Sequence, residues 1–331
     1  MRASTLVLSF SLLVMLNSQQ SLAQKPTGLP NSYPMKPVSV IIGTAPGGSS
    51  DTLGRLVFRH LGEAWGHPFV VENRGSVQGS ALALEYVSKQ PADGYTLDAV
   101  AGGTYIGAVA HNLPKNVLKV IDPVAQFTSQ AFLLVTTGSL PANTVLDLVA
   151  IAKNSPDKLN YASPGFASVG HLVGEYLKHE YKINMTHVPY KGIALAYSDL
   201  LAGRTQLTFA SSIVAGTFAK NGSVKILAAT SAKRLHNFPD VPTIGESVPG
   251  FEFISFTGVV APSGVPRPII NALNNQVNQI LQKADVKKGL EADGSIVTPG
   301  TPEAFHKTLE TLVRRVDSLI FDAKLDLREA K

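Results

Sequence analysis

Val38-Ser-Val-Ile-Ile-Gly-Thr-Ala-Pro-Gly-Gly-Ser-Ser50 is the stretch that decides the fold. Its first five residues are an apolar, largely β-branched run that is typical of a buried strand, and the Pro-Gly-Gly segment that follows predicts a turn. From Ser50 to Trp65 apolar residues return at helical spacing, and Gly66 ends this predicted helix. Strand, glycine turn and helix in this order are typical of a βαβ unit.

Residues 163–168 repeat the pattern, since both stretches read Pro-Gly-x-x-Ser after a predicted strand. Both also open a predicted amphipathic helix, where free backbone N–H groups and the helix dipole favour an anion. Hydroxyl groups flank both loops, those of Thr44, Ser49 and Ser50 in the first and of Ser163 and Ser168 in the second. The pair of loops therefore predicts two lobes that close on one small anion.

Strands and helices alternate along most of the chain, which predicts an α/β protein with a mostly parallel sheet in each of two lobes. We expect residues 24–127 and 253–331 to form lobe 1 and residues 128–252 to be inserted as lobe 2. The two crossings, near 124–129 and 253–259, would form a hinge. Two C-terminal amphipathic helices, from Pro268 to Gln282 and from Pro302 to about Ala323, would return to lobe 1.

Residues 1–23 have the layout of a secretory signal peptide, with Arg2, an apolar stretch over 6–16 and a small-residue cleavage site ending at Ala23. A short membrane anchor is the alternative, although the apolar stretch is short for a bilayer. The 331 residues include no cysteine, so the fold must rest on its hydrophobic core rather than on disulfides. We expect cleavage near Ala23 and export to a bacterial periplasm.

Composition and spacing argue against several functions. The formal charge is +5, but no Lys/Arg run with interleaved aromatic residues supports nucleic-acid binding. The first loop lacks the Gly-Lys-Ser/Thr of a phosphate-binding P-loop and the G-x-G-x-x-G of a dinucleotide site. The eight histidines show no metal-binding spacing, so neither a metal nor a cofactor is expected. Ser168 and His171 could be a nucleophile and its base, so a secreted serine hydrolase is an alternative, although G-x-S-x-G is absent. If the protein is not a hydrolase, we expect His171 to pack behind the loop.

Ligands of open α/β sheets bind outside the carboxyl ends of the strands, where several further loops of this chain are predicted to end. Thr104 and Ser211 follow predicted strands there, and so does Lys191, for which a solvated or hinge-bridging position is the alternative. The candidate ligand-binding residues are Thr44, Pro46, Gly47, Gly48, Ser49, Ser50, Thr104, Ser163, Gly165, Phe166, Ala167, Ser168 and Ser211.

Eight motifs occur in one order along the chain. They are APGGSSD (45–51), VENRG (71–75), DGYTL (93–97), NYASPG with a following H-L-x-G-E (160–175), HVPYKG (187–192), TSAKR (230–234), DVPTIGE (240–246) and APSGVPRP (261–268). Together they resemble the solute-binding proteins of tripartite tricarboxylate transporters, the Bug receptor family, from about Tyr33 to the C-terminal helix. The resemblance implies a type II, Venus-flytrap periplasmic-binding-protein fold. It also implies that the protein delivers a small carboxylate to the permease subunits of the transporter.

The resemblance also implies that main-chain amides, hydroxyls and bridging waters of the two Pro-Gly loops hold the ligand carboxylate. Thr104 and Ser211 would then contact its distal end. This chain departs from the family pattern at Thr44, where an aromatic residue is usual, in the segment 75–80, at Ser211-Ser212 and at Phe166. A dicarboxylate, a tricarboxylate and an aromatic acid remain open as ligands of a monomeric receptor. A ligand sensor of a signalling system is the alternative role.

Overall fold

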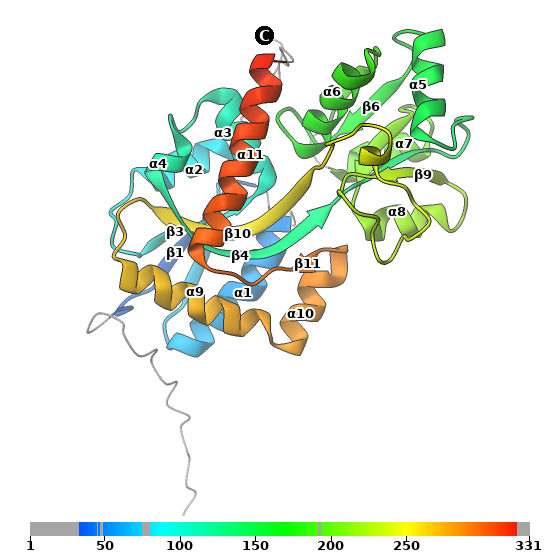
Figure 1. Cartoon of the computed structure of the whole chain (residues 1–331). Helices are drawn as coiled ribbons and strands as arrows, with labels where there is room; N and C mark the ends of the chain where they lie inside the picture. The colour runs from blue at the N-terminus through cyan, green and yellow to red at the C-terminus, as the bar shows by residue number, and fades with distance from the viewer. Residues whose placement is uncertain (1–32, 45, 47–48, 75–79, 191–192, 323–331) are drawn as a thin grey trace, which may run out of the picture.

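The computed structural model describes residues 33–44, 46, 49–74, 80–190 and 193–322, and it shows an α/β protein of two lobes with one sheet each (Figure 1). The predicted signal peptide, parts of the first loop and Lys191 lie outside the described residues. Within these residues, no helix combines the length and the apolar character needed to cross a bilayer.

The first sheet belongs to the lobe that carries both the N-terminal and the C-terminal helices (Figure 1). Its strands are β1 (Val38–Ile42), β2 (Phe69–Asn73), β3 (Thr96–Ala101), β4 (Ile121–Ala131), β10 (Ile254–Pro262) and β11 (Ile296–Val297). The helices around it are α1 (Ser49–Trp65), α2 (Ala81–Ser88), α3 (Gly102–His111), α4 (Val117–Val120), α9 (Arg267–Leu281), α10 (Ala284–Leu290), η2 (Glu291–Asp293) and α11 (Pro302–Asp322).

The second sheet is built from the middle of the chain. Its strands are β5 (Leu133–Thr137), β6 (Asn160–Ser163), β7 (Thr186–Pro189), β8 (Leu207–Ala210) and β9 (Val224–Ala229). The helices that accompany it are α5 (Val145–Asn154), α6 (Val169–Tyr181), α7 (Ile193–Leu201), α8 (Ser212–Ala219) and η1 (Ile244–Glu246).

The two sheets share one topology. The strand order is β2-β1-β3-β10-β4 in the first sheet, with β11 added at the edge, and β7-β6-β8-β5-β9 in the second. In each, the second strand in this order, β1 or β6, pairs in parallel with its two neighbours, and an antiparallel strand comes next in the sheet. The loops after β1 and β6, which are the two Pro-Gly loops, therefore occupy equivalent positions in the two lobes.

The predicted two-lobed α/β fold is confirmed, and both sheets are mixed, with parallel and antiparallel pairs. Besides the short edge strand β11, the antiparallel strands are β10 and β5, each of which brings the chain into its sheet from the other lobe. A strand that arrives from the hinge side runs against the strands of the βαβ units. Local strand and helix signals do not reveal this reversal.

Thr230 ties the two crossing segments together. The chain leaves the first sheet through Phe132, between β4 and β5, and returns through Phe253, just before β10. The Thr230 hydroxyl accepts from the Phe132 N–H (2.9 Å) and donates to the Phe253 carbonyl (2.7 Å). Its backbone N–H and carbonyl bind the same two residues. The predicted lobe boundaries at 127/128 and 252/253 lie close to these crossings and stay a prediction.

Candidate functional site

Two loops of the first lobe meet at the carboxyl ends of its parallel strands. The Asn73 side chain, at the end of β2, donates to the Thr44 carbonyl (3.0 Å) and to the Asp51 carboxylate (2.9 Å). A Cβ on Gly43 would lie 2.4 Å from the Cβ of Ser80, so only glycine lets β1 end this close to α2. Side-chain contacts and close packing thus bring the loops after β1 and β2 together.

The first Pro-Gly loop is described only at its margins. Pro46 is exposed, Ser50 is buried in α1, and the Thr44 hydroxyl is buried without a described hydrogen-bond partner. Gly47, Gly48 and the side chain of Ser49 lie outside the described part. The anion-binding role of this loop therefore stays a prediction.

Thr104 lies in the first turn of α3, as its position after a strand predicts. It is buried, and its hydroxyl oxygen accepts from the Ser80 hydroxyl (2.8 Å) and from the Ala101 N–H (3.3 Å). Two donors already occupy this oxygen, so the hydroxyl proton is what Thr104 could offer a ligand. Beside it, a Cβ added to Gly103 would meet no atom within 4 Å.

The hydroxyls of the second Pro-Gly loop bind the loop itself. Ser163, which is fully buried, donates to the Gly165 carbonyl (2.9 Å) and accepts from the Gly165 N–H (3.2 Å). The Ser168 hydroxyl donates to the same carbonyl (2.6 Å) and caps α6 by accepting from the His171 N–H (3.3 Å). These bonds give the loop its shape before any ligand arrives.

The backbone of this loop provides donors for an anion. The N–H groups of Val169 and Gly170, in the first turn of α6, donate to no acceptor within the described residues. Gly165 and Ala167 have positive φ angles of 132° and 53°. A loop in this conformation, followed at once by a helix start, provides the free N–H groups that bind carboxylates in other proteins.

Two histidines lie beneath the loop, and the sequence predicted a packed position for one of them. His171 on α6 and His187 on β7 stack with their ring centres 3.9 Å apart. The His187 Nε2 atom is 2.6 Å from the Ser163 hydroxyl. Burial, His171 and Lys178 together lower the pKa of His187 to about 3. His187 was not among the predicted residues, because only the parallel pairing of β6 and β7 brings it to the loop.

The geometry does not assemble the serine hydrolase that the sequence left open. Ser168 donates to a backbone carbonyl, and the Nδ1 atom of His171 accepts from the Ala167 N–H (3.2 Å). Ser163 is close to His187, but its side chain has no exposure to solvent. A nucleophile must reach an external substrate, so neither pair is arranged for nucleophilic catalysis.

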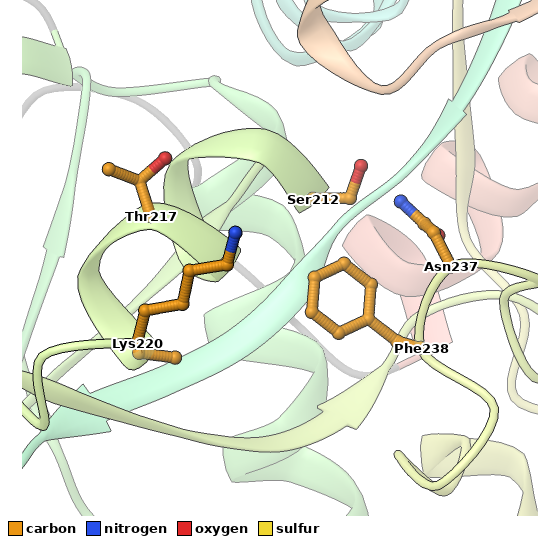
Figure 2. A pocket seen from close by; sticks show the side chains of 7 residues that line it. Ser212, Thr217, Lys220, Asn237 and Phe238 are labelled. Atoms are coloured by element: carbon orange, nitrogen blue, oxygen red, sulfur yellow. The ribbon is translucent and has the colours of Figure 1, made fainter.

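Ser211 is the N-cap residue of α8, a position equivalent to the start of α3 in the other lobe. The next hydroxyl, that of Ser212, is buried and has no described partner. It lines a pocket of about 580 Å³ between α8 and the 237–238 segment. Figure 2 shows Thr217 of α8 and Lys220, the residue after α8, on one side of this pocket and Phe238 with Asn237 on the other.

A second pocket, of about 420 Å³, lies between the hinge strands β4 and β10 and α11. Lys307 and Arg315 of α11 line it, as do Gln126 and Ser129 of β4. Neither pocket is lined by a predicted ligand-binding residue. The assignment of the predicted residues to a ligand site therefore stays a prediction. Among the residues with described side chains, no group of His, Asp and Glu could hold a metal ion.

Two lobes of the same topology, joined by two strands and carrying equivalent Pro-Gly loops, define a two-lobed binding protein. The sequence matches the family described as "Tripartite tricarboxylate transporter family receptor" (TctC) over residues 53–325. The chain belongs to this family, as its motifs predicted.

Individual relatives agree with this assignment. The protein BugT of Bordetella pertussis is 30% identical over 277 residues, which cover 82% of this chain and 85% of BugT. A solved R. palustris protein with adipate is 31% identical and superposes with a TM-score of 0.76, covering 88% of this chain and 98% of that one. MatC from Rhodopseudomonas palustris with bound malate is 29% identical with a TM-score of 0.77, covering 87% and 100%.

Proposed function

We propose that the protein is a periplasmic solute-binding receptor that captures a small organic carboxylate between its lobes and delivers it, without chemical change, to the permease of a tripartite tricarboxylate transporter. The observation that carries this proposal is the equivalent position of the two Pro-Gly loops, each at the start of a helix after the strand next to the sheet edge. The dicarboxylates named with two relatives, adipate and malate, support this ligand class.

In this proposal each lobe supplies part of the site. Lobe 1 contributes Thr44, residues 46–50 and Thr104, and lobe 2 contributes Ser163, residues 165–168 and Ser211. Because the hydroxyls of Ser163 and Ser168 bind within their own loop, the N–H groups of Val169 and Gly170 are the direct donors we add to the set.

Closure of the two lobes must supply most of the affinity. A dissociation constant of about 1 μM corresponds to about 8 kcal/mol. Two helix N-termini at about 0.3–1 kcal/mol each fall far short of this. Several charge-assisted hydrogen bonds at about 1.5–3 kcal/mol each reach it. We therefore expect the closed form, in which both lobes donate at once, to be the form that the permease recognises.

A thermal-shift screen tests the binding function. Dicarboxylates, tricarboxylates, aromatic acids and amino acids are added to the mature protein, and at least one carboxylate should raise the unfolding midpoint. The Ser168→Asp variant should lose this shift, because the added carboxylate repels the ligand at the start of α6. Ser168→Asn is the matched control, since it can still cap the helix but has no charge. Equal shifts in both variants would contradict the proposed site.

Two further measurements separate binding from the alternatives. The ligand should be recovered unchanged after prolonged incubation, whereas a hydrolase would consume it. Deleting the gene should abolish uptake of the identified carboxylate by the cell. Unchanged uptake together with a lost transcriptional response to the ligand would favour a sensor instead.

A further inference from the structure

The second Pro-Gly loop rests on a stack of three rings. The planes of His171 and His187 are within 6° of parallel, and Tyr161 stacks on the other face of His187 with ring centres 4.8 Å apart. Phe166, in the loop itself, meets both imidazoles edge-on, with ring centres 5.5 and 5.2 Å away. The histidines thus contact the loop through its only aromatic side chain and through two hydrogen bonds.

The hydrogen bonds determine where the histidine protons lie. The Nδ1 atom of His171 accepts from the Ala167 N–H (3.2 Å), so this ring must have its proton on Nε2. The Ser163 hydroxyl has a single proton, which goes to the Gly165 carbonyl. The contact of 2.6 Å with His187 is then satisfied only when His187 Nε2 donates to the hydroxyl oxygen. His171 is therefore a neutral Nε2–H tautomer, and His187 donates through its Nε2–H.

Neutral His171 supports an uncommon backbone conformation. Ala167 lies in the left-handed region, with φ of 53°, although it is not glycine, and its side chain is buried. Such a conformation persists where its surroundings hold it. If His171 were protonated, an Nδ1–H would point at the Ala167 N–H, and the bond that supports this conformation would be lost.

We propose that the His171–His187 stack positions the second Pro-Gly loop for anion binding, and that it does so only while His171 is neutral. This inference rests on the proposed function, because it concerns the loop that would hold the ligand carboxylate. Both histidines act through the loop and are positioning residues. The anion would be held by neutral N–H groups and not by an imidazolium charge.

The groups around the stack favour neutral rings. Glu175 of α6 is the nearby carboxylate, and it accepts from Tyr161 (2.6 Å) and from Lys178 (2.8 Å). Lys178 compensates the charge of this carboxylate. Burial, the second imidazole and Lys178 act together to lower the pKa of His187.

Four variants separate the hydrogen bonds from the stacking. Asn places an amide close to the Nδ1 position of histidine, and Gln places one close to Nε2. His171→Asn and His187→Gln should therefore keep binding of the carboxylate found in the screen within about threefold of wild type. His171→Phe and His187→Phe keep a stacking ring but lose the hydrogen bond, and each should weaken binding about tenfold. Circular dichroism checks that all four variants fold.

The pH profile and the tautomers complete the test. The wild-type affinity should stay constant between pH 8 and pH 5.5, across the range in which an ordinary histidine gains its charge. The ¹⁵N spectrum at pH 6 should show both rings as neutral Nε2–H forms. An affinity that rises as the pH falls through 6.5, or an Nδ1–H signal from His171, would overturn the inference.

The outcomes separate this inference from the proposed function. Equal binding by all four variants contradicts the positioning role and leaves the receptor function intact. If none of the screened carboxylates raises the unfolding midpoint of the wild-type protein, both the positioning role and the receptor function are contradicted.

Discussion

At the scale of single residues, Asp98 has an unusual environment for a carboxyl group. It lies on β3 between β1 and β10, is 1% exposed, and its Oδ2 atom has no described hydrogen-bond partner. Burial raises the pKa of Asp98 well above its usual range, because desolvation penalises the charged form. The folded protein therefore keeps the Asp98 proton to a higher pH than the unfolded chain does.

A dependence of stability on pH follows. The unfolded chain releases the Asp98 proton above about pH 4, whereas the folded protein keeps it. The free energy of unfolding should thus fall as the pH rises above 4, by up to about 1.4 kcal/mol per pH unit until the raised pKa is passed. In Asp98→Asn this contribution should disappear. Urea unfolding at pH 4.5, 6 and 8 measures the free energy of unfolding of the wild type and of Asp98→Asn. If this free energy changes with pH by the same amount in both proteins, the raised pKa of Asp98 is contradicted.

Gly174 is a second residue with a testable steric role. A Cβ at this position of α6 would lie 2.4 Å from a ring carbon of Tyr161, the ring that stacks on His187. Gly174→Ala should lower the free energy of unfolding by about 1–3 kcal/mol through overpacking.

Gly54→Ala in α1 is the matched control for Gly174→Ala, since its added Cβ would meet only ordinary contacts at 3.5 Å or more. With no clash, the higher helix propensity of alanine should stabilise this variant by about 0.5–1 kcal/mol. Chemical denaturation compares the two variants. Stabilisation by both would show that the Tyr161 ring moves freely.

At the scale of elements, Thr230 connects the two segments that join the lobes. Thr230→Val would leave the Phe132 N–H and the Phe253 carbonyl without the side-chain partner they now share. Because Thr230 is fully buried, this loss should lower the free energy of unfolding by about 1–3 kcal/mol. Thr230→Ser keeps the hydroxyl and should retain most of the stability. Equal losses in the two variants would assign the effect to the methyl group instead.

Elements also show what a sequence can and cannot reveal. The strand over 38–42, the helix to Trp65 and the two loops were predictable because their signals lie in adjacent residues. The antiparallel entry of β5 and β10 was not, because it depends on how the chain crosses between lobes.

The same distinction holds at the site. Ser163 and Ser168 were recognised as loop hydroxyls, but no local pattern tells where a hydroxyl donates. Their bonds to Gly165 appear only in the folded loop. His187 reaches Ser163 through the pairing of β6 with β7, which sequence spacing does not give.

At the scale of the whole molecule, one hydrophobic cluster extends through both lobes. It contains Tyr105 and Ile106 of α3 in the first lobe together with Leu172 and Val173 of α6 in the second. The helices α3 and α6 are also in direct contact. The two lobes therefore share apolar contacts besides the two strands that join them.

A shared core predicts that the lobes unfold together. Calorimetry of the protein should show one transition whose calorimetric and van't Hoff enthalpies agree. Ile106→Ala truncates a fully buried side chain of the first lobe. It should lower the midpoint of this single transition and decrease the free energy of unfolding by about 2–5 kcal/mol. A bound carboxylate should raise the same single midpoint, since it binds only the folded form. Two resolved transitions, of which the substitution or the ligand moves only one, would contradict this prediction. Each lobe would then be stable by itself, and the apolar contacts between the lobes would contribute little to stability.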